Sequence, residues 1–432
     1  MHKIILTIII LWSLPSLVVA QNSTAGVIPD LGLQVFIDSA FANSPVIKDN
    51  QNKLRYSDLN LKQAIAELSA PKIYIASEVL IAPYVNNNGK FISSNPDNKA
   101  IGYDAGITNG GLYSATTHAK LPLFTASGKK AYREVASAQT ETYTNQIELS
   151  KHELEQQVTY QYVDCYLAQL QITYIQKTID LLQEQQAIVK TLVLNALAKQ
   201  SDYLLLGIEI QNQKIQLAQF QSDYATAFLQ LKTICGISDT TLKQIAPPEI
   251  VPRRPNNDSK VLKIYRTDSL QIMAAQNVFN LKYKPSFSLY ADGGLNAIEI
   301  PGIQRKFGVS AGITFNWMLY DGKQKRLEQQ KNAILLNTTQ TYRTGFLKQH
   351  QLQKQNTLKE LSYAKGILLQ KQQQVADYVQ LLQLYEVQLG QGQLSVIDYL
   401  NTIRSYGNLQ RDLAIAEANI LRIINEYNYL NW

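Results

Sequence analysis

The chain has 432 residues, with 41 Lys and Arg against 34 Asp and Glu, and a formal net charge of +7. The charges are scattered and no basic run interleaves with aromatic residues, so the sequence gives little support to nucleic-acid binding. Two cysteines, Cys165 and Cys235, are too few for a disulfide framework.

Catalytic patterns are also missing from the sequence. The four histidines show neither metal-ligand spacing nor a nucleophile paired with a base. Gly110-Gly111 and Gly293-Gly294 lack the context of a phosphate-binding loop. We therefore expect a protein that is not an enzyme and that uses no cofactor and no metal.

Residues 1–20 have the form of a secretory signal peptide. His2 and Lys3 precede an apolar stretch, and Val18-Val19-Ala20 offers a small-residue cleavage site. Pro15 interrupts the apolar run, which is shorter than the roughly 20 residues that a membrane-spanning helix needs. We expect cleavage near Ala20. Because no later stretch reaches that apolar length, membrane insertion would have to use β-strands.

The rest of the sequence consists of two copies of one unit. In the first copy, residues 21–236, apolar residues have helical spacing from Asp30 to Ser69, and Ser44-Pro45 is a helix start. Alternating segments then predict strands at about 72–84 and 112–124. A long helical hairpin is predicted over about 129–236.

Residues 237–257 are rich in proline and predict an irregular linker around mid-length. The second copy, residues 258–432, repeats the order of the first, with a helix and then strands at about 286–291 and 307–320. A second long helical hairpin is predicted over about 322–430. The strand at 307–320 has the clearest alternation in the chain.

The predicted hairpins contain heptad repeats. Apolar residues fall seven apart in both copies, at Val158, Cys165, Ile172 and Ile179, and at Leu361, Leu368, Val375 and Leu382. This spacing is typical of coiled coils. A further apolar series on the opposite side of the first long helix indicates neighbours on both flanks. A helix over 129–194 would be roughly 100 Å long, about three times the thickness of a bilayer's hydrocarbon core.

Four strands are too few to close a barrel, and an open sheet edge in lipid leaves backbone groups unsatisfied. Several chains must therefore contribute strands to one barrel, if the strands enter a membrane. The simpler alternative is a small β flap on a soluble coiled-coil protein.

Several short motifs carry a family resemblance. They are Asn43-Ser44-Pro45, Pro122-Leu123-Phe124 with Gly128-Lys129-Lys130, its counterpart Leu319-Tyr320-Asp321-Gly322-Lys323, and the segment from Gly392 to Leu400. In order and spacing, the chain resembles the TolC-like outer-membrane efflux proteins over nearly all of its mature length.

The resemblance implies a mainly α fold with a β-barrel part, in which a trimeric twelve-stranded outer-membrane barrel continues into a periplasmic α-helical tunnel. It implies a passive channel-tunnel of a tripartite efflux or type I secretion system in a Gram-negative bacterium. The implied partners are two further copies of the chain, outer-membrane lipid, a periplasmic adaptor (membrane fusion) protein and an inner-membrane transporter. The alternative is a secreted periplasmic coiled-coil scaffold or adaptor without a pore. The cargo stays open among drugs, metal ions and proteins.

The resemblance also implies a pore constriction at the periplasmic tip. In the family, aspartates at the position of Asp398 and three residues later narrow the pore, but this chain has Asn401 at the second position. Asp202 and Gln200 occupy the corresponding part of the first copy. The structural alternative is that Asp202, Asp398, Ser201 and Ser395 cap the returning helices.

In the family, adaptor docking uses the helix tips. Here the tips are Asn195-Ala196-Leu197 in the first copy and Gly390 to Gly392 in the second, of which only the second has glycine. Ordinary turn chemistry explains these glycines equally well.

Aromatic residues near the predicted strand ends are candidates for an interfacial girdle, with ordinary strand packing as the alternative. They are Tyr84, Tyr113, Phe124, Phe287, Tyr290, Trp317 and Tyr320. Cys165 and Cys235 fall at similar heights on adjacent helices, where either a disulfide or two buried free thiols would fit.

Overall fold

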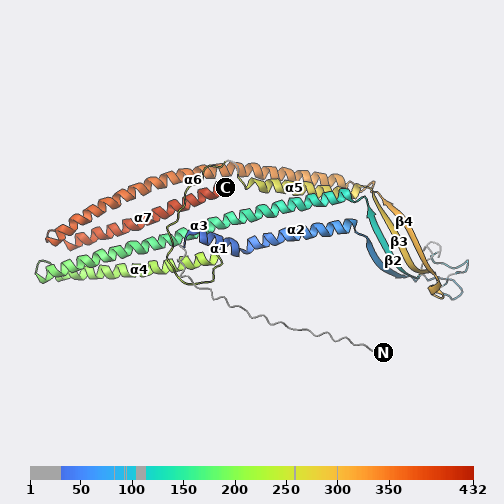
Figure 1. The fold of residues 1–432 in the computed structure, drawn as a ribbon, viewed down its shortest axis with the longest axis horizontal. Helices are drawn as coiled ribbons and strands as arrows, with labels where there is room; N and C mark the ends of the chain where they lie inside the picture. Colours follow the sequence, from blue (N-terminus) through green and yellow to red (C-terminus); the bar gives the residue numbers. More distant parts are fainter. Residues whose placement is uncertain are drawn as a thin grey trace, which may run out of the picture.

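The computed structural model describes residues 31–432 apart from 82, 92, 94, 104–112, 257–258 and 299. The signal segment and its cleavage site therefore lie outside the described residues. A small β-sheet occupies one end of an elongated molecule, and the long helices run from it to two hairpin turns at the far end (Figure 1).

Capping residues between the first two helices define where the second one begins. Helix α1 spans Leu33–Asn43 and α2 spans Pro45–Ser69. The Ser44 hydroxyl accepts a hydrogen bond from the backbone N–H of Ile47 at 3.4 Å, and Pro45 occupies the first helical position, which suits a residue without an N–H. Helix α2 leads directly into the sheet.

The sheet is antiparallel, with strand order β1-β2-β3-β4. The strands span Lys72–Val79 (β1), Tyr113–Leu123 (β2), Ser286–Ala297 (β3) and Phe307–Asn316 (β4). Strands β2 and β3 pair from Tyr113↔Ala297 to Leu123↔Phe287, so this pairing joins the two copies.

Three predicted strand bounds need correction. The strand predicted at 286–291 runs on to Ala297, because the small residues beyond Ala291 pair with both neighbouring strands. The strands predicted at 72–84 and 307–320 end earlier, at Val79 and Asn316, where the described ladder stops.

The long helices are α3 (Ala126–Leu194) and α6 (Gln324–Gly390), with 69 and 67 residues. Each is about 100 Å long at 1.5 Å per residue. They return as α4 (Gln200–Ile234) and α7 (Val396–Leu430). None of the described helices has a stretch apolar enough, over sufficient length, to span a membrane.

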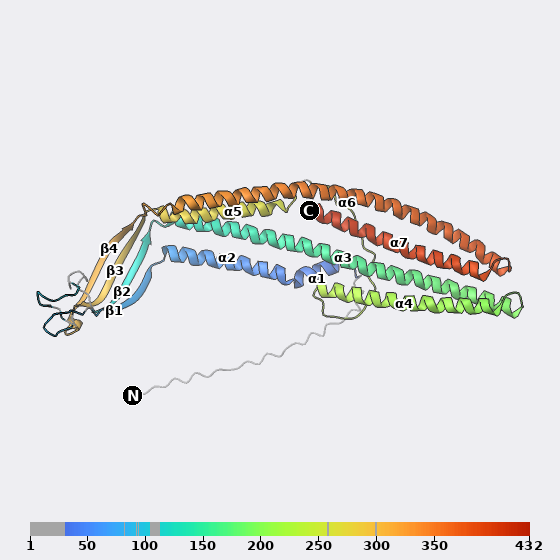
Figure 2. The ribbon, with the colours of Figure 1, turned by 180° about the vertical axis from the view of Figure 1, so that it is seen from behind.

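Shorter helices extend the returning ones. Helix α5 (Leu262–Phe279) runs into a 3₁₀ turn at Asn280–Tyr283 before β3, and a second 3₁₀ turn spans Ile303–Arg305. In both views, α2 and α4 lie end to end beside α3, and α5 and α7 lie end to end beside α6 (Figures 1 and 2). Each copy is thus one continuous long helix accompanied by two short ones.

A buried cluster at mid-length joins α1, α3, α4 and the linker. It includes Phe36, Tyr162, Phe228 and Ile245. The Tyr162 hydroxyl lies 2.9 Å from the carbonyl oxygen of Leu31 and 2.6 Å from that of Ala246, which ties α3 to both adjoining segments. Burial here keeps the backbone of the irregular linker in place.

Cys165 and Cys235 lie in this cluster and are free thiols. Burial raises the pKa of each thiol to about 12, so both stay protonated at neutral pH. They behave as small apolar core residues.

Candidate functional site

The sheet has one apolar face and one polar face. In the register of the four strands, most of the alternate residues on one side are apolar, and most of the large ones are exposed. They include Ile73, Ile75, Val79, Leu121, Leu289, Val309, Ile313 and Phe315. Ile75 is 78% exposed and Val309 is 81% exposed, so none of the described residues covers this face.

The opposite face carries a row of polar side chains across all four strands. Tyr74, His118, Asp292 and Ser310 are cross-strand partners in turn. The Tyr74 ring stacks on His118 at 5.0 Å between centroids, and His118 Nδ1 lies 2.6 Å from Asp292 Oδ1. Ser310 Oγ donates to Asp292 Oδ2 at 3.4 Å. These polar side chains make this face suitable for contact with water.

The sheet also has two open edges. Among the described residues, β1 pairs only with β2 and β4 only with β3. The four strands have 8, 11, 12 and 10 residues, close to the roughly 9–11 residues of a strand that crosses a bilayer. An exposed apolar face on strands of this length matches a lipid-facing surface.

The aromatic residues considered for an interfacial girdle lie in different parts of the structure. Phe124, Phe287, Trp317 and Tyr320 lie at the end of the sheet that adjoins the helices, where Phe124 and Phe287 make an edge-to-face contact with 5.7 Å between centroids. Tyr290 instead lies on the polar face, packed over Gly312. Tyr84 is buried, and its hydroxyl donates to the carbonyl of Tyr103 at 2.6 Å.

The two hairpin turns have the same backbone structure. After α3, the N–H of Leu197 bonds to the carbonyl of Leu192 at 2.8 Å, and Ala196 has a left-handed φ of 57°. After α6, the N–H of Gln393 bonds to the carbonyl of Gln388 at 2.9 Å, and Gly392 has a φ of 69°. Both are Schellman-type ends, and the first places alanine where glycine is preferred.

The proposed tip residues are solvent-accessible. Asn195, Ala196, Leu197, Gly390 and Gly392 belong to the two turns, of which Gly390 is the last residue of α6. Leu197 is 69% exposed although it is apolar. An exposed leucine at a loop tip is a feature that a partner surface would cover.

The candidate constriction residues lie just after these turns. Asp398 and Asn401 are exposed in the first turns of α7, while Tyr399 and Leu400 between them are buried. Asp202 is half-buried and accepts a hydrogen bond from the backbone N–H of Lys199 at 3.3 Å, so it caps α4. Gln200, the first residue of α4, is exposed.

Capping explains Ser395 but not Ser201. The Ser395 hydroxyl accepts a hydrogen bond from the N–H of Ile397 at 3.2 Å at the start of α7. Ser201 is the second residue of α4, inside the helix, so the predicted cap at this position is wrong. Asp398 is not the N-terminal cap of α7, and its carboxylate makes no hydrogen bond to the other described residues.

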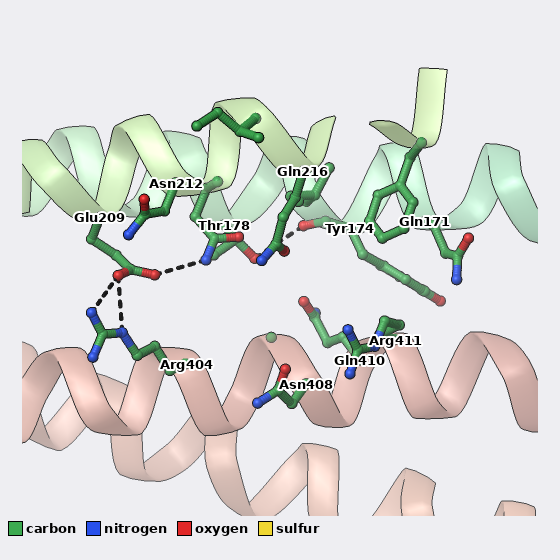
Figure 3. Close-up of a pocket in the computed structure, with 15 residues that line it drawn as sticks. Gln171, Tyr174, Thr178, Glu209, Asn212, Gln216, Arg404, Asn408, Gln410 and Arg411 are labelled. Carbon is green, nitrogen blue, oxygen red and sulfur yellow. Dashed lines mark hydrogen bonds and ion pairs between the residues drawn. The ribbon is translucent and has the colours of Figure 1, made fainter. Parts of the chain in front are cut away.

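An ion pair that the sequence did not indicate joins the two hairpins. Arg404 of α7 donates from Nε and Nη2 to Oε2 of Glu209 on α4, at 2.9 and 2.6 Å (Figure 3). Gln213 donates to Oε1 of the same carboxylate at 2.8 Å. Glu209 is 3% exposed. The pair therefore fixes α7 against α4 near the tips.

The charge state of Glu209 follows from competing effects. Burial alone raises the pKa of Glu209, but the hydrogen bonds from Arg404 and Gln213 outweigh it and hold the pKa below its usual range. The carboxylate is ionised at neutral pH. Its contribution to stability is present above the ordinary pKa of a glutamate and is lost as the pH falls through the lowered value.

A polar cavity of about 490 Å³ lies beside this ion pair, between α3, α4 and α7 (Figure 3). Its walls are mainly amides and hydroxyls, including Gln171, Thr178, Asn212, Gln216, Asn408 and Gln410. Within the described part of the chain, no group of three or more His, Cys, Asp or Glu side chains could hold a metal ion. The arrangement suits contact with water and solutes.

Several solved structures share this architecture. The outer membrane protein VceC from Vibrio cholerae has a TM-score of 0.66 and 13% identity, covering 92% of this chain and 96% of VceC. The Campylobacter jejuni CmeC outer membrane channel has a TM-score of 0.62 and 12% identity, covering 93% of this chain and 86% of CmeC. The open state of the Neisseria gonorrhoeae MtrE outer membrane channel has a TM-score of 0.65 and 14% identity, covering 93% of this chain and 89% of MtrE.

No protein-family model and no curated protein sequence matches the chain. The chain has the fold of these outer-membrane proteins, which confirms the predicted resemblance at the level of fold. It is mainly helical with a small sheet, as expected.

The left-handed backbone at Ala196 generates a prediction about the first tip. We expect Ala196→Gly to slow amide hydrogen exchange over residues 192–198 by roughly fivefold, because glycine removes about 1 kcal/mol of strain at a positive φ. The matched variant Gly392→Ala should speed exchange over residues 388–394 by a similar factor, since a Cβ there meets no neighbouring atom and only the backbone is strained. Unchanged exchange in both variants would contradict this account of the turns.

Proposed function

We propose that the chain is a passive outer-membrane channel-tunnel of a tripartite efflux or type I secretion system. Three copies form a twelve-stranded barrel, and their long helices form a tunnel through the periplasm. An adaptor protein and an inner-membrane pump deliver the cargo to the tunnel. The observation that carries this proposal is the four-stranded sheet, with its exposed apolar face, its polar face and its two open edges.

The sheet supports several chains per barrel. A membrane barrel needs at least about eight strands, and three chains with four strands each would supply twelve. Pairing of β4 with β1 of the next chain would satisfy both open edges and leave the apolar faces toward lipid. The polar row from Tyr74 to Ser310 would then line the water-filled interior.

The long helices support the same assembly. Helix α6 buries only Thr357, Leu361, Leu382 and Leu389 within the chain. Other apolar side chains of α6 are exposed, including Ile334 at 67%, Leu352 at 60% and Leu369 at 69%. Heptad packing against a neighbouring chain would cover them.

Asp398, Asn401, Asp202 and Gln200 are proposed to form the constriction at the tunnel's inner end. Asp398 supports this role best, because its carboxylate is exposed beside the α6–α7 turn. Three copies of one aspartate around a narrow neck would favour cations. The tips at Asn195, Ala196, Leu197, Gly390 and Gly392 are proposed to contact the adaptor.

Solved structures of the same fold support the membrane role. VceC is described as an outer membrane protein, and CmeC and MtrE as outer membrane channels. Their low identity to this chain leaves the cargo and the pump undefined.

Membrane fractionation, size measurement in detergent and planar-bilayer recording test the proposal. We expect the full chain in the outer-membrane fraction, as a trimer that conducts ions. A water-soluble protein that conducts no ions would overturn the proposal and favour the coiled-coil scaffold instead.

The two faces of β4 give a matched pair of variants. Ile313→Arg places a charge on the apolar face, where lipid contact would cost roughly 2–4 kcal/mol near the bilayer midplane. Thr314→Arg places the same charge one residue later, on the polar face. We expect Ile313→Arg to reduce the amount of assembled trimer in outer membranes strongly and Thr314→Arg to reduce it little. Equal effects of the two variants would contradict the assignment of the faces.

The charge at the tip should set ion selectivity. We expect Asp398→Asn to reduce the cation preference of the channel, measured as the reversal potential under a salt gradient, because one carboxylate per chain leaves the neck. Asp49→Asn on α2 removes an equal charge far from the tips and should leave the reversal potential unchanged. An unaltered reversal potential in Asp398→Asn would remove Asp398 from the constriction.

A further inference from the structure

Exposed basic side chains gather where the strands meet the helices. Lys130 and Arg133 lie in the first turns of α3, Lys284 lies two residues before β3, and Lys323, Lys325 and Arg326 lie at the start of α6. We call these six residues the basic collar. They come from three separate segments of the chain, all at the same end of the sheet (Figure 1).

The collar has no anionic partner within the described part of the protein. None of its six side chains forms an ion pair there, although ten pairs are present elsewhere. Nearby carboxylates are already engaged, because Glu134 accepts from Asn277 at 2.8 Å and Glu328 pairs with Lys331 at 2.7 Å. Asp321 accepts from the Tyr283 hydroxyl and from the N–H of Lys325.

Helix stability does not account for these cations. The dipole of an α-helix favours acidic side chains in the first turn and disfavours basic ones. Neither α3 nor α6 has an acidic residue in its first turn. The six exposed cations have no direct ion-pair partner among the described residues, so they are free to bind anions from outside the chain.

Exposed aromatic and apolar side chains lie beside the collar. Phe124 is 82% exposed, Trp317 is 55% exposed and Tyr320 is 79% exposed. The apolar face of the sheet thus ends in aromatic residues and then in lysines and arginines. This order is typical of a protein that passes from hydrocarbon through the headgroup layer into water.

We propose that the basic collar binds the anionic headgroups of phospholipids in the membrane leaflet that faces the helices. The inference rests on the proposed membrane insertion of the sheet. Lysine and arginine next to a membrane attract anionic lipid electrostatically, with a range of about one Debye length. Phosphate groups would pair with collar side chains, none of which forms an ion pair with a described residue.

The fluorescence of Trp317 can report which lipids lie next to the basic collar. It lies at the collar and donates from Nε1 to the carbonyl of Tyr283 at 3.3 Å. The only other described tryptophan, Trp432, follows α7 at mid-length and stacks on His152, well away from the sheet (Figure 1). Bromine on a lipid chain quenches tryptophan on contact, so the full chain can be reconstituted in vesicles of equal parts phosphatidylglycerol and phosphatidylcholine. In one preparation the anionic lipid is brominated and in the other the zwitterionic lipid.

We expect brominated phosphatidylglycerol to quench Trp317 roughly two- to threefold more than brominated phosphatidylcholine at low salt, with the ratio falling toward one at high salt. The collar variant should bring the ratio close to one at low salt. It replaces Lys130, Lys284, Lys323 and Lys325 with glutamine. A matched variant replaces four exposed helix lysines outside the collar with glutamine and should keep the wild-type ratio. These are Lys177, Lys190, Lys214 and Lys348.

The possible failures can be told apart. Equal quenching by both lipids in the wild-type protein would overturn the collar and leave membrane insertion standing. If both variants lowered the quenching ratio equally, the preference for anionic lipid would come from net charge, and the proposed role of the collar would also be overturned. Quenching by neither lipid would mean that the sheet does not enter the bilayer, and the proposed function would fail with it.

Discussion

The structure depends on a sheet that a single chain cannot complete. Its exposed apolar face is stable only against lipid or another apolar surface. The backbone N–H and C=O groups on the outer edges of β1 and β4 need hydrogen-bond partners. Water would solvate the edges but not the face, and lipid would solvate the face but not the edges. The proposed closed barrel, shared by several chains, would meet both needs at once.

The sheet also constrains the positions of the long helices, because these helices begin where strands end. Each strand pair leads into a helix about 100 Å long, so in the proposed assembly the pair of strands before each long helix would set the position of that helix. The internal pairing of β2 with β3 holds the two copies at a fixed spacing. Farther out, the Glu209–Arg404 pair and the buried cluster around Leu182, Leu389 and Tyr399 hold the two hairpins together at their tips.

Periodic features of the fold could be predicted from the sequence. The heptad positions Val158, Cys165 and Ile179 are buried, because a seven-residue spacing places them on one side of a helix. The alternation in 307–320 predicted a strand with one apolar face, which the structure has over Phe307–Asn316. The extension of β3 to Ala297 was missed, because Asp292-Gly293-Gly294 has no alternation and pairs through its backbone with two flanking strands.

Long-range polar contacts could not be predicted in this way. His118 and Asp292 are 174 residues apart, and Glu209 and Arg404 are 195 residues apart, so no local spacing connects either pair. The turn at Asn195-Ala196-Leu197 was predicted, but its left-handed backbone was not, since alanine gives no sign of a positive φ. Its counterpart Gly392 does indicate a positive φ, because glycine is preferred at that position of a helix end.

The long helices of the two copies are buried to different extents within the chain, although the copies share one order of elements. Helix α3 has neighbours along its length, with α2, α4, α5 and α7 all in contact, and buries residues from Gly128 to Val189. Helix α6 packs mainly on α5 and α7 and leaves Tyr342, Tyr363 and Ile367 exposed. One long helix therefore stabilises the single chain, whereas the other keeps its apolar surface available for a neighbour. In the proposed assembly, such a division would let each chain hold its shape alone and would still favour the ring, because the hydrophobic gain of covering α6 would be realised only between chains.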